Sequence, residues 1–202
     1  MDGSSKVYSN KVFIEDYLTT RALTQEIVEN LAPEDMVIQP CDYVSPTKWH
    51  LGHTTWFFEK FLLLPFHKSY KSFSRDFNYI FNSYYNSAGP FNSRDKRGFL
   101  NRPLLKEVIN YRKYVDENIF ELFSKDQPDP RMELLELGIN HEQQHQELIL
   151  MDIKNVFFSN PLKPSFTNSN IEKSKKIAKN NFILSENKEF TYGSDEKSFY
   201  YD

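Results

Sequence analysis

Apolar residues recur at helical spacing in four stretches of the chain, with polar residues between them. The stretches are residues 12–31, 45–64, 101–123 and 130–158. Ser45-Pro46 suits a helix start, because serine caps helix N-termini and proline fits the first turn. Pro33, Pro65 and Pro161 follow three of the stretches and favour helix ends there. Four amphipathic helices of this length predict a mainly α fold, a four-helix bundle.

The connection between the second and third predicted helices is long. It covers residues 66–100, is rich in Ser, Asn, Tyr and Phe, and contains the turn signal Gly89-Pro90. A structureless loop of that length is uncommon in a compact domain and is often functional. This connection is therefore a candidate functional loop.

The pattern changes after the fourth stretch. Residues 163–181 are polar and lysine-rich, which predicts a linker. Residues 182–184 and 189–194 have the pattern of short strands with a turn. So small a β piece cannot bury a core by itself. We expect a helical domain over residues 10–162, then the linker, and in residues 182–202 the first β-strands of an incomplete second domain.

Composition narrows the class of protein. Hydrophobic residues make up 39% of the chain and aromatic residues 16%, which is enough bulk for a core. The net charge of -3 gives no electrostatic reason to expect nucleic acid or an anionic membrane as a partner. No stretch approaches the ~20 apolar residues of a membrane span, and residues 1–6 lack the apolar core of a signal peptide. The single cysteine, Cys41, excludes an internal disulfide, so a cytoplasmic location is expected.

Four of the five histidines lie in two short motifs, His50 and His53 in the second stretch and His141 and His145 in the fourth. Residues four apart on a helix lie on one face, about one turn apart. The fourth stretch is apolar, and buried paired histidines need a partner for their ring nitrogens, which a metal ion supplies. His141 and His145 are therefore predicted metal ligands, and neutral imidazole suits iron, zinc and copper.

A third imidazole from the second stretch would complete a three-histidine site. His53 is favoured because its helix is apolar and Gly52 lets another backbone or a ligand approach. His50 lies three residues earlier and stays an alternative, while His67 is expected at the surface. Three histidines without a carboxylate leave coordination positions open for substrate and dioxygen, unlike the usual iron triad of two histidines and one carboxylate.

Polar neighbours of the two ligands give further candidates. Glu142 and Glu147 could orient the imidazoles through hydrogen bonds, or could be solvated charges. Gln144 could hydrogen-bond a substrate near the metal. The run His-Glu-Gln-Gln-His also fits the H-E-x-x-H pattern of zinc hydrolases, with Glu142 as general base. However, no histidine follows His145 to serve as a third ligand.

Four segments carry longer and more specific motifs. Residues 45–59 read SPTKWHLGHTTWFFE, 82–86 NSYYN, 97–103 RGFLNRP and 139–148 INHEQQHQEL. These motifs resemble those of the sulfoxide synthases of ergothioneine biosynthesis (EgtB type). They span most of residues 12–160, the whole predicted helical part.

The resemblance implies a DinB-like four-helix domain followed by a domain like the formylglycine-generating enzyme (sulfatase-modifying factor). It implies a mononuclear iron(II), Fe(II), held on the matching positions by His53, His141 and His145. The implied reaction uses dioxygen (O2) to join the thiol of γ-glutamylcysteine or cysteine to the imidazole C2 of hercynine as a sulfoxide. Arg94 and Arg97 match arginines that bind the carboxylates of the thiol substrate, and Gln144 matches a substrate-contacting glutamine.

In that family, an active-site tyrosine and much of the hercynine pocket lie in the second domain. Residues 182–202 resemble only its first strands, so we expect this chain to fold and bind metal but to turn over poorly or not at all. Two other functions stay open. One is a stand-alone DinB-like thiol transferase or hydrolase with zinc or nickel on the same histidines, and the other is a non-catalytic helical binding module.

Overall fold

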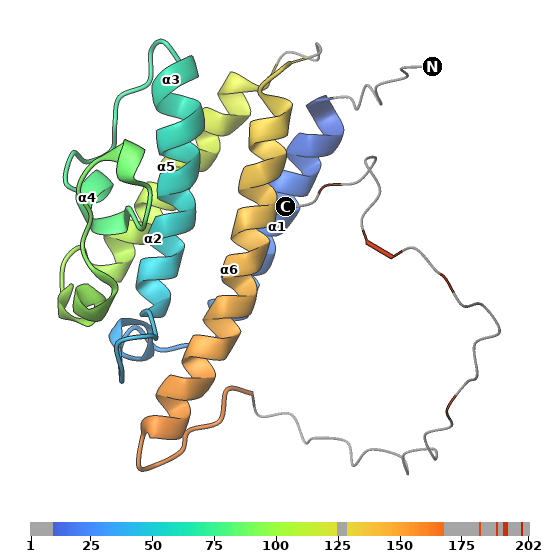
Figure 1. Cartoon of the computed structure of the whole chain (residues 1–202). Coiled ribbons are helices and arrows are strands. Elements are labelled where there is room, and N and C mark those ends of the chain that lie inside the picture. The colour runs from blue at the N-terminus through green and yellow to red at the C-terminus, as the bar shows by residue number, and fades with distance from the viewer. Residues whose placement is uncertain are drawn as a thin grey trace. The chain divides into compact units, whose positions relative to one another are not determined.

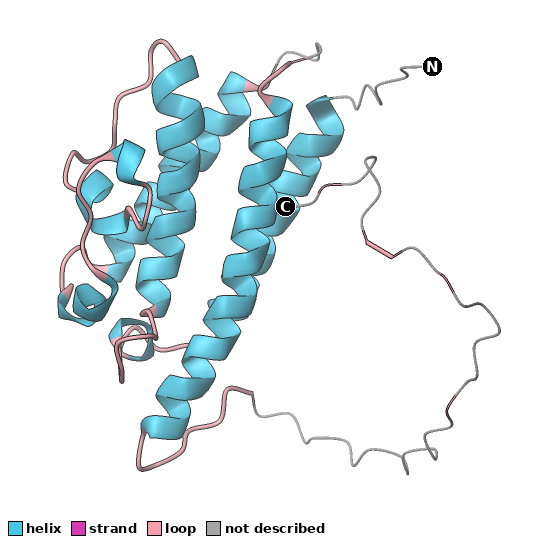
Figure 2. Ribbon diagram, viewed as in Figure 1, coloured by secondary structure: helices cyan, strands magenta, loops and turns pink. Residues whose placement is uncertain are grey.

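The computed structural model describes residues 10–124 and 129–167, together with residues 182, 189, 192, 193 and 199. The helices belong to a unit that spans Met1–Asn168, and Ser169–Asp202 forms a separate unit (Figure 1). The helices are α1 (Asn10–Val28), α2 (Thr47–Phe58), α3 (Leu64–Phe66), α4 (Phe77–Phe81), α5 (Leu105–Leu122) and α6 (Met132–Ser159). Every described element is helical, and no strand occurs among the described residues (Figure 2).

The four long predicted helices are present and form the bundle. Helix α6 packs against α1 on one side and against α2 on another, and α2 also packs against α5 (Figure 1). The core between them is closed by large side chains that are almost fully buried: Tyr17, Trp56, Phe58, Tyr111, Leu135 and Ile153. The prediction of a mainly helical fold is confirmed.

Close helix packing depends on glycine at one crossing. A Cβ atom added to Gly138 of α6 would lie 2.3 Å from Cε1 of Phe58 in α2. A larger side chain would have to move the Phe58 ring, so glycine at this position allows the close approach of α6 to α2.

The inward stripe of α1 mixes apolar and polar residues. It repeats at intervals of three or four, as expected for one helix face. Its buried members are Ile14, Tyr17, Thr20, Arg21, Thr24 and Val28. Arg21 is 4% exposed, which places a positive charge inside the bundle and requires a buried partner.

Helix α2 begins differently from the sequence prediction. The N-cap residue is Pro46, and no side chain caps the helix. The Ser45 hydroxyl instead accepts a hydrogen bond from Arg97 (2.8 Å), and the Ser45 amide donates to Asp152 (2.9 Å). The prediction of a Ser45 cap was therefore wrong, because this serine links two other elements.

The second predicted helix is continuous but changes its winding. Helix α2 passes through a π-helical segment, Glu59–Leu63, into α3. The buried Glu59 carboxylate accepts hydrogen bonds from the hydroxyls of Tyr70 (2.6 Å) and Tyr111 (2.5 Å). These hydrogen bonds join the π-helical segment to α5 and to the connection that follows α3.

The long connection holds short helices. Besides α4, it contains the 3-10 helices Asn86–Ala88 and Arg94–Phe99. The His67 side chain is only 8% exposed and lies 3.7 Å from the Glu121 carboxylate, so its expected surface position was wrong. The connection folds against α2, as Trp49 donates from its indole N–H to the Ile80 carbonyl (3.0 Å).

The predicted linker and strands fall mostly outside the residues that the structure describes. Most of residues 163–181 and 182–202, including the expected strands at 182–184 and 189–194, lie outside the described residues. The domain boundaries stay a prediction.

Among the described residues, no helix is long and apolar enough to cross a membrane.

Candidate metal centre

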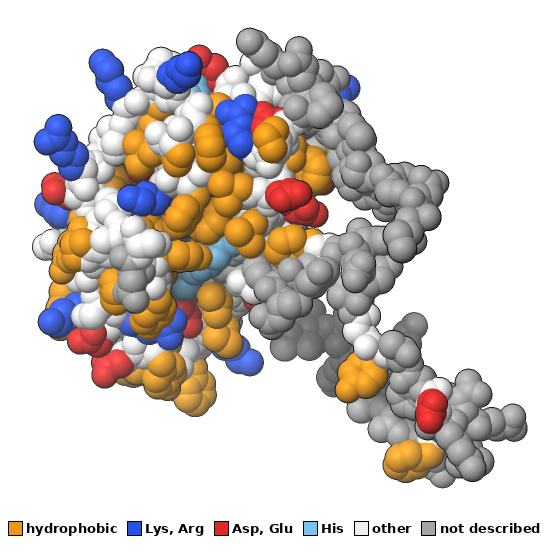
Figure 3. Space-filling model, turned by 45° about the horizontal axis from the view of Figure 1, so that its top comes forward, with side chains coloured by type: hydrophobic (Ala, Val, Ile, Leu, Met, Phe, Trp, Pro, Cys, Tyr) orange, Lys and Arg blue, Asp and Glu red, His pale blue; other side chains and the backbone are white. Residues whose placement is uncertain are grey.

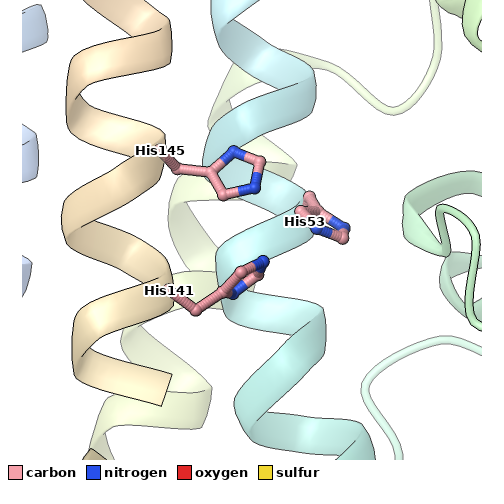
Figure 4. Close-up of side chains that lie close together, drawn as sticks. All are labelled: His53, His141 and His145. Carbon is pink, nitrogen blue, oxygen red and sulfur yellow. The ribbon is translucent and has the colours of Figure 1, made fainter. Parts of the chain in front are cut away.

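Three predicted ligands from two helices come together inside the bundle. His53 projects from α2, and His141 and His145 project from α6, with the three rings turned toward one another (Figure 4). One ring nitrogen from each lies within 4.8 Å of the others. The side chains are 2%, 8% and 8% exposed, respectively. The fold therefore supplies three buried imidazoles at a spacing that one ion could bridge.

His53 is held by backbone and by aromatic rings. Its Nδ1 lies 2.6 Å from the carbonyl oxygen of Phe81, the last residue of α4. A carbonyl only accepts, so Nδ1 carries the proton and donates, which leaves the Nε2 lone pair free. The ring is nearly parallel to those of Trp49 (4.5 Å between centroids, 12°) and Trp56 (5.6 Å, 18°). Gly52 was expected to let another backbone or a ligand approach, but the group that lies against it is the side chain of Phe81, whose Cε1 would lie 2.2 Å from an added Cβ.

His50 lies within hydrogen-bond distance of His145, a predicted metal ligand, and is not one of the three grouped histidines. Its Nδ1 lies 2.8 Å from Nδ1 of His145, and its Nε2 lies 2.9 Å from the Asp152 carboxylate. Both ring nitrogens of His50 are thus engaged. Between the two alternatives for the third position, the geometry favours His53.

His141 has a nitrogen without a protein partner. Its Nδ1 is buried and makes no hydrogen bond in the structure. The ring packs on Phe57 (4.6 Å between centroids) and on His145 (4.7 Å). No hydrogen bond of this ring therefore competes with coordination of a metal ion by His141. The donor set therefore fits a metal.

The three imidazoles are neutral at physiological pH. Burial lowers the pKa of His141 to about 4, against a usual value of 6.5. Burial also lowers the pKa values of His53 and His145 well below 6.5, and neighbouring imidazoles add to the effect. Neutral imidazole is the form that coordinates a metal, so the site is prepared for binding without first losing protons.

Glu142 faces away from the histidines. Its carboxylate accepts hydrogen bonds from Arg21 (2.8 Å), Arg112 (2.8 Å) and Thr24 (2.7 Å). Burial would raise its pKa, but the two arginines outweigh burial and lower the pKa to about 2. A carboxylate held this firmly is a poor general base. The H-E-x-x-H hydrolase interpretation therefore lacks its base, and exposed Glu147 gives no support to a role in orienting an imidazole.

A family model, the DinB superfamily, matches residues 16–149, more than half of the chain. The chain belongs to the DinB superfamily. Domains of this superfamily are in general metal-dependent. No curated protein matches the chain.

Four histidines of the DinB domain, His50, His53, His141 and His145, line a cavity of about 380 Å³ that opens to the surface. In Figure 3, a pale blue patch of histidine surface is visible near the centre, among hydrophobic side chains. Predicted substrate residues Arg94, Arg97 and Gln144 line the same cavity. Its other polar lining residues include Tyr43, Ser45, Ser83, Tyr84, Tyr85 and Asp152.

Arg97 is the most constrained of the predicted substrate residues. Its guanidinium carbon lies 3.3 Å from the centroid of the Trp49 ring, and the side chain is 3% exposed. It donates to the hydroxyls of Ser45 (2.8 Å) and Ser83 (3.2 Å), while its Nε has no hydrogen-bond partner. Burial, with Arg94 nearby, lowers its pKa to about 10, so it stays charged at pH 7. Among the described residues, no carboxylate forms an ion pair with it.

The sequence did not point to three polar residues of this DinB site, Asp152, Tyr84 and Tyr85. Asp152 follows His145 by seven residues, two helical turns, and this spacing could have placed both on one face of α6. The tyrosines Tyr84 and Tyr85 were treated only as part of a motif. Tyr85 is half-buried, and burial raises the pKa of its hydroxyl.

Proposed function

We propose that this DinB domain is the iron(II)-binding part of a sulfoxide synthase that joins a cysteine thiol to the imidazole carbon of hercynine. One observation carries the proposal: three neutral, buried imidazoles share a cavity with a buried arginine that lacks an ion-pair partner among the described residues. Such a cavity suits a substrate that carries both a metal-binding thiol and a carboxylate.

His53, His141 and His145 would hold the iron. When bound, iron(II) supplies open positions for a thiolate and for dioxygen and lowers the pKa of the thiol. The protein contributes fixed ring orientations, since the Phe81 carbonyl holds His53. The surrounding Trp49 and Trp56 rings exclude water from one side of the site.

Arg97 would bind a carboxylate of the thiol substrate. A guanidinium matches a carboxylate in shape and charge, and burial strengthens the pair. Its unpaired Nε is a donor that a ligand could use. Arg94 and Gln144 line the same cavity and would make the outer contacts. Together these residues would orient the thiol sulfur toward the histidines.

The proposed reaction balances without a further reductant. The thiol loses its S–H hydrogen, and the imidazole carbon of hercynine loses its C–H hydrogen as the C–S bond forms. One oxygen atom of dioxygen joins the sulfur as the sulfoxide, and the other leaves as water with the two hydrogens. The motifs at residues 45–59 and 139–148 support this assignment through their resemblance to the sulfoxide synthases.

Anaerobic titration with iron(II), followed by calorimetry, tests the metal site. We expect stoichiometric binding by the chain and loss of binding in His145→Ala. His67→Ala is a matched control, because His67 lies outside the group of three histidines. Equal iron binding by the chain and by His145→Ala would contradict the site.

Addition of γ-glutamylcysteine or cysteine, hercynine and dioxygen then tests the chemistry, with the sulfoxide detected by mass spectrometry. Little or no sulfoxide is expected from this chain, and full activity from it would contradict that expectation. A longer form with the second domain is expected to form the sulfoxide, and its His145→Ala variant is not. Zinc-dependent thiol transfer or hydrolysis without oxygen consumption would instead favour the alternative DinB activity. The resemblance assigns an active-site tyrosine and much of the hercynine pocket to the second domain. The assay therefore compares this chain with a form that carries that domain.

A further inference from the structure

A chain of three side chains leads from α6 through α2 and back to the metal site. The Asp152 carboxylate lies 2.9 Å from Nε2 of His50, and Nδ1 of His50 lies 2.8 Å from Nδ1 of His145. All three side chains are less than 10% exposed. Water therefore competes little for these hydrogen bonds, and each proton in them is carried by one of the three side chains.

The donors and acceptors allow one arrangement when His50 is neutral. An ionised carboxylate only accepts, so the single N–H of His50 is on Nε2 and points to Asp152. Nδ1 of His50 then has only a lone pair and must accept. The proton between the two rings therefore belongs to His145, on its Nδ1. This leaves the lone pair of His145 on Nε2.

We propose that Asp152 and His50 are positioning residues that fix the tautomer and the ring orientation of His145, so that its Nε2 is the metal ligand. The proposal rests on the three-histidine iron site proposed above. A carboxylate that holds a ligating histidine is common at metal sites. Here a second imidazole stands between the carboxylate and the ligand.

The Asp152 end of this hydrogen-bonded series has a second contact. The Asp152 oxygen that contacts His50 also accepts from the Ser45 amide (2.9 Å). The Ser45 hydroxyl in turn accepts from Arg97. Asp152 thus connects the ring of His145 with the arginine proposed to bind substrate. His53 differs, because a backbone carbonyl fixes it and no side-chain substitution removes that partner.

Substitutions separate the hydrogen bond from the fold. His50→Phe keeps an aromatic ring but cannot accept from His145. Asp152→Asn keeps an oxygen acceptor and removes the charge, whereas Asp152→Ala removes both. Tyr70→Phe is the matched control, because it deletes a bond to the buried Glu59 carboxylate and Tyr70 has no ring contact with His50 or with the three grouped histidines.

Cobalt(II) is the probe, because its visible absorption reports the geometry of its ligands and its affinity is measured in the same titration. We expect His50→Phe and Asp152→Ala to bind cobalt(II) about 10–100-fold more weakly than the unsubstituted chain, with a changed spectrum. Asp152→Asn is expected to lose less and to keep the spectrum. Tyr70→Phe is expected to lower stability toward urea and to leave affinity and spectrum unchanged.

The outcomes distinguish this proposal from the proposed function. If the chain binds cobalt(II) and His145→Ala does not, but His50→Phe matches the chain in affinity and spectrum, the positioning role is wrong and the metal site stands. If the chain itself binds no metal, both fail. If His50→Phe does not fold, as judged by circular dichroism, the Asp152 variants decide. The proposal is overturned if Asp152→Ala binds cobalt(II) with the same affinity and spectrum as the unsubstituted protein and as Asp152→Asn.

Discussion

Glu142→Gln tests whether the charged cluster behind the histidines holds the bundle together. Glu142 is fully buried and is bound by Arg21 of α1 and Arg112 of α5. Helix α6 is thereby joined to two other helices by one carboxylate. The substitution keeps the shape of the side chain. It leaves the buried Arg112 without its ion-pair partner and leaves Arg21 with Asp116 alone.

The expected loss is large. The pKa of Glu142 is about 2 in the fold, against 4.5 for an ordinary glutamate. At about 1.4 kcal/mol for each pKa unit, its ionisation stabilises the fold by about 3 kcal/mol at pH 7. Because the pKa is depressed by folding, this stabilisation is complete above about pH 5 and is lost as the pH falls toward 2. Breaking a buried ion pair typically costs about 3–5 kcal/mol, which agrees.

Urea unfolding of the chain and of Glu142→Gln, followed by circular dichroism, measures the difference. We expect Glu142→Gln to be less stable by about 3 kcal/mol at pH 7 and by only about 1 kcal/mol at pH 3. Glu147→Gln, on the exposed face of the same helix, is the control and should change stability by less than about 0.5 kcal/mol. A Glu142→Gln chain as stable as the control at pH 7 would refute the assignment of a structural ion cluster.

Three further predictions follow from the geometry. Gly138→Ala forces Phe58 aside, so its free energy of unfolding by urea should fall by about 1–3 kcal/mol despite the better helix propensity of alanine. Because burial keeps the pKa of His141 near 4, cobalt(II) affinity should fall less than about tenfold between pH 7.5 and 5.5, whereas three exposed histidines would lose roughly 1000-fold. Arg97→Met should raise the KM of a thiol substrate about 10–100-fold and leave cobalt(II) binding unchanged, with Arg102→Met, at an exposed position, as the control.

The long helices could be predicted from the sequence because their apolar period is sustained over several turns. The observed bounds of α5 and α6 lie within a few residues of the prediction. Helix α4 was missed, since five residues are too few to establish a period. The Ser45 cap was wrong for a different reason: local preference favours capping, but long-range bonds to Arg97 and Asp152 decide the conformation.

The grouping of the candidate site could be predicted only in part. Spacing within one helix placed His141 beside His145, but it could not choose between His50 and His53, which lie three residues apart on one helix. That choice depends on where Phe81 and Asp152 lie in space. These contacts join residues distant in the sequence, which no local pattern records.

Helix α6 uses two of its faces, one for the histidine group and the other for hydrogen bonds to α1. His141 and His145 point one way, while Glu142 and Gln146, each one position further along, bond to α1. A helix rotates by about 100° per residue, so insertion or deletion of a single residue before this segment would turn both sets away from their present partners. The bonds to α1 and the histidine group would be lost together. Evolutionary change in this helix is therefore confined to substitution, and length variation should be found in the connections instead.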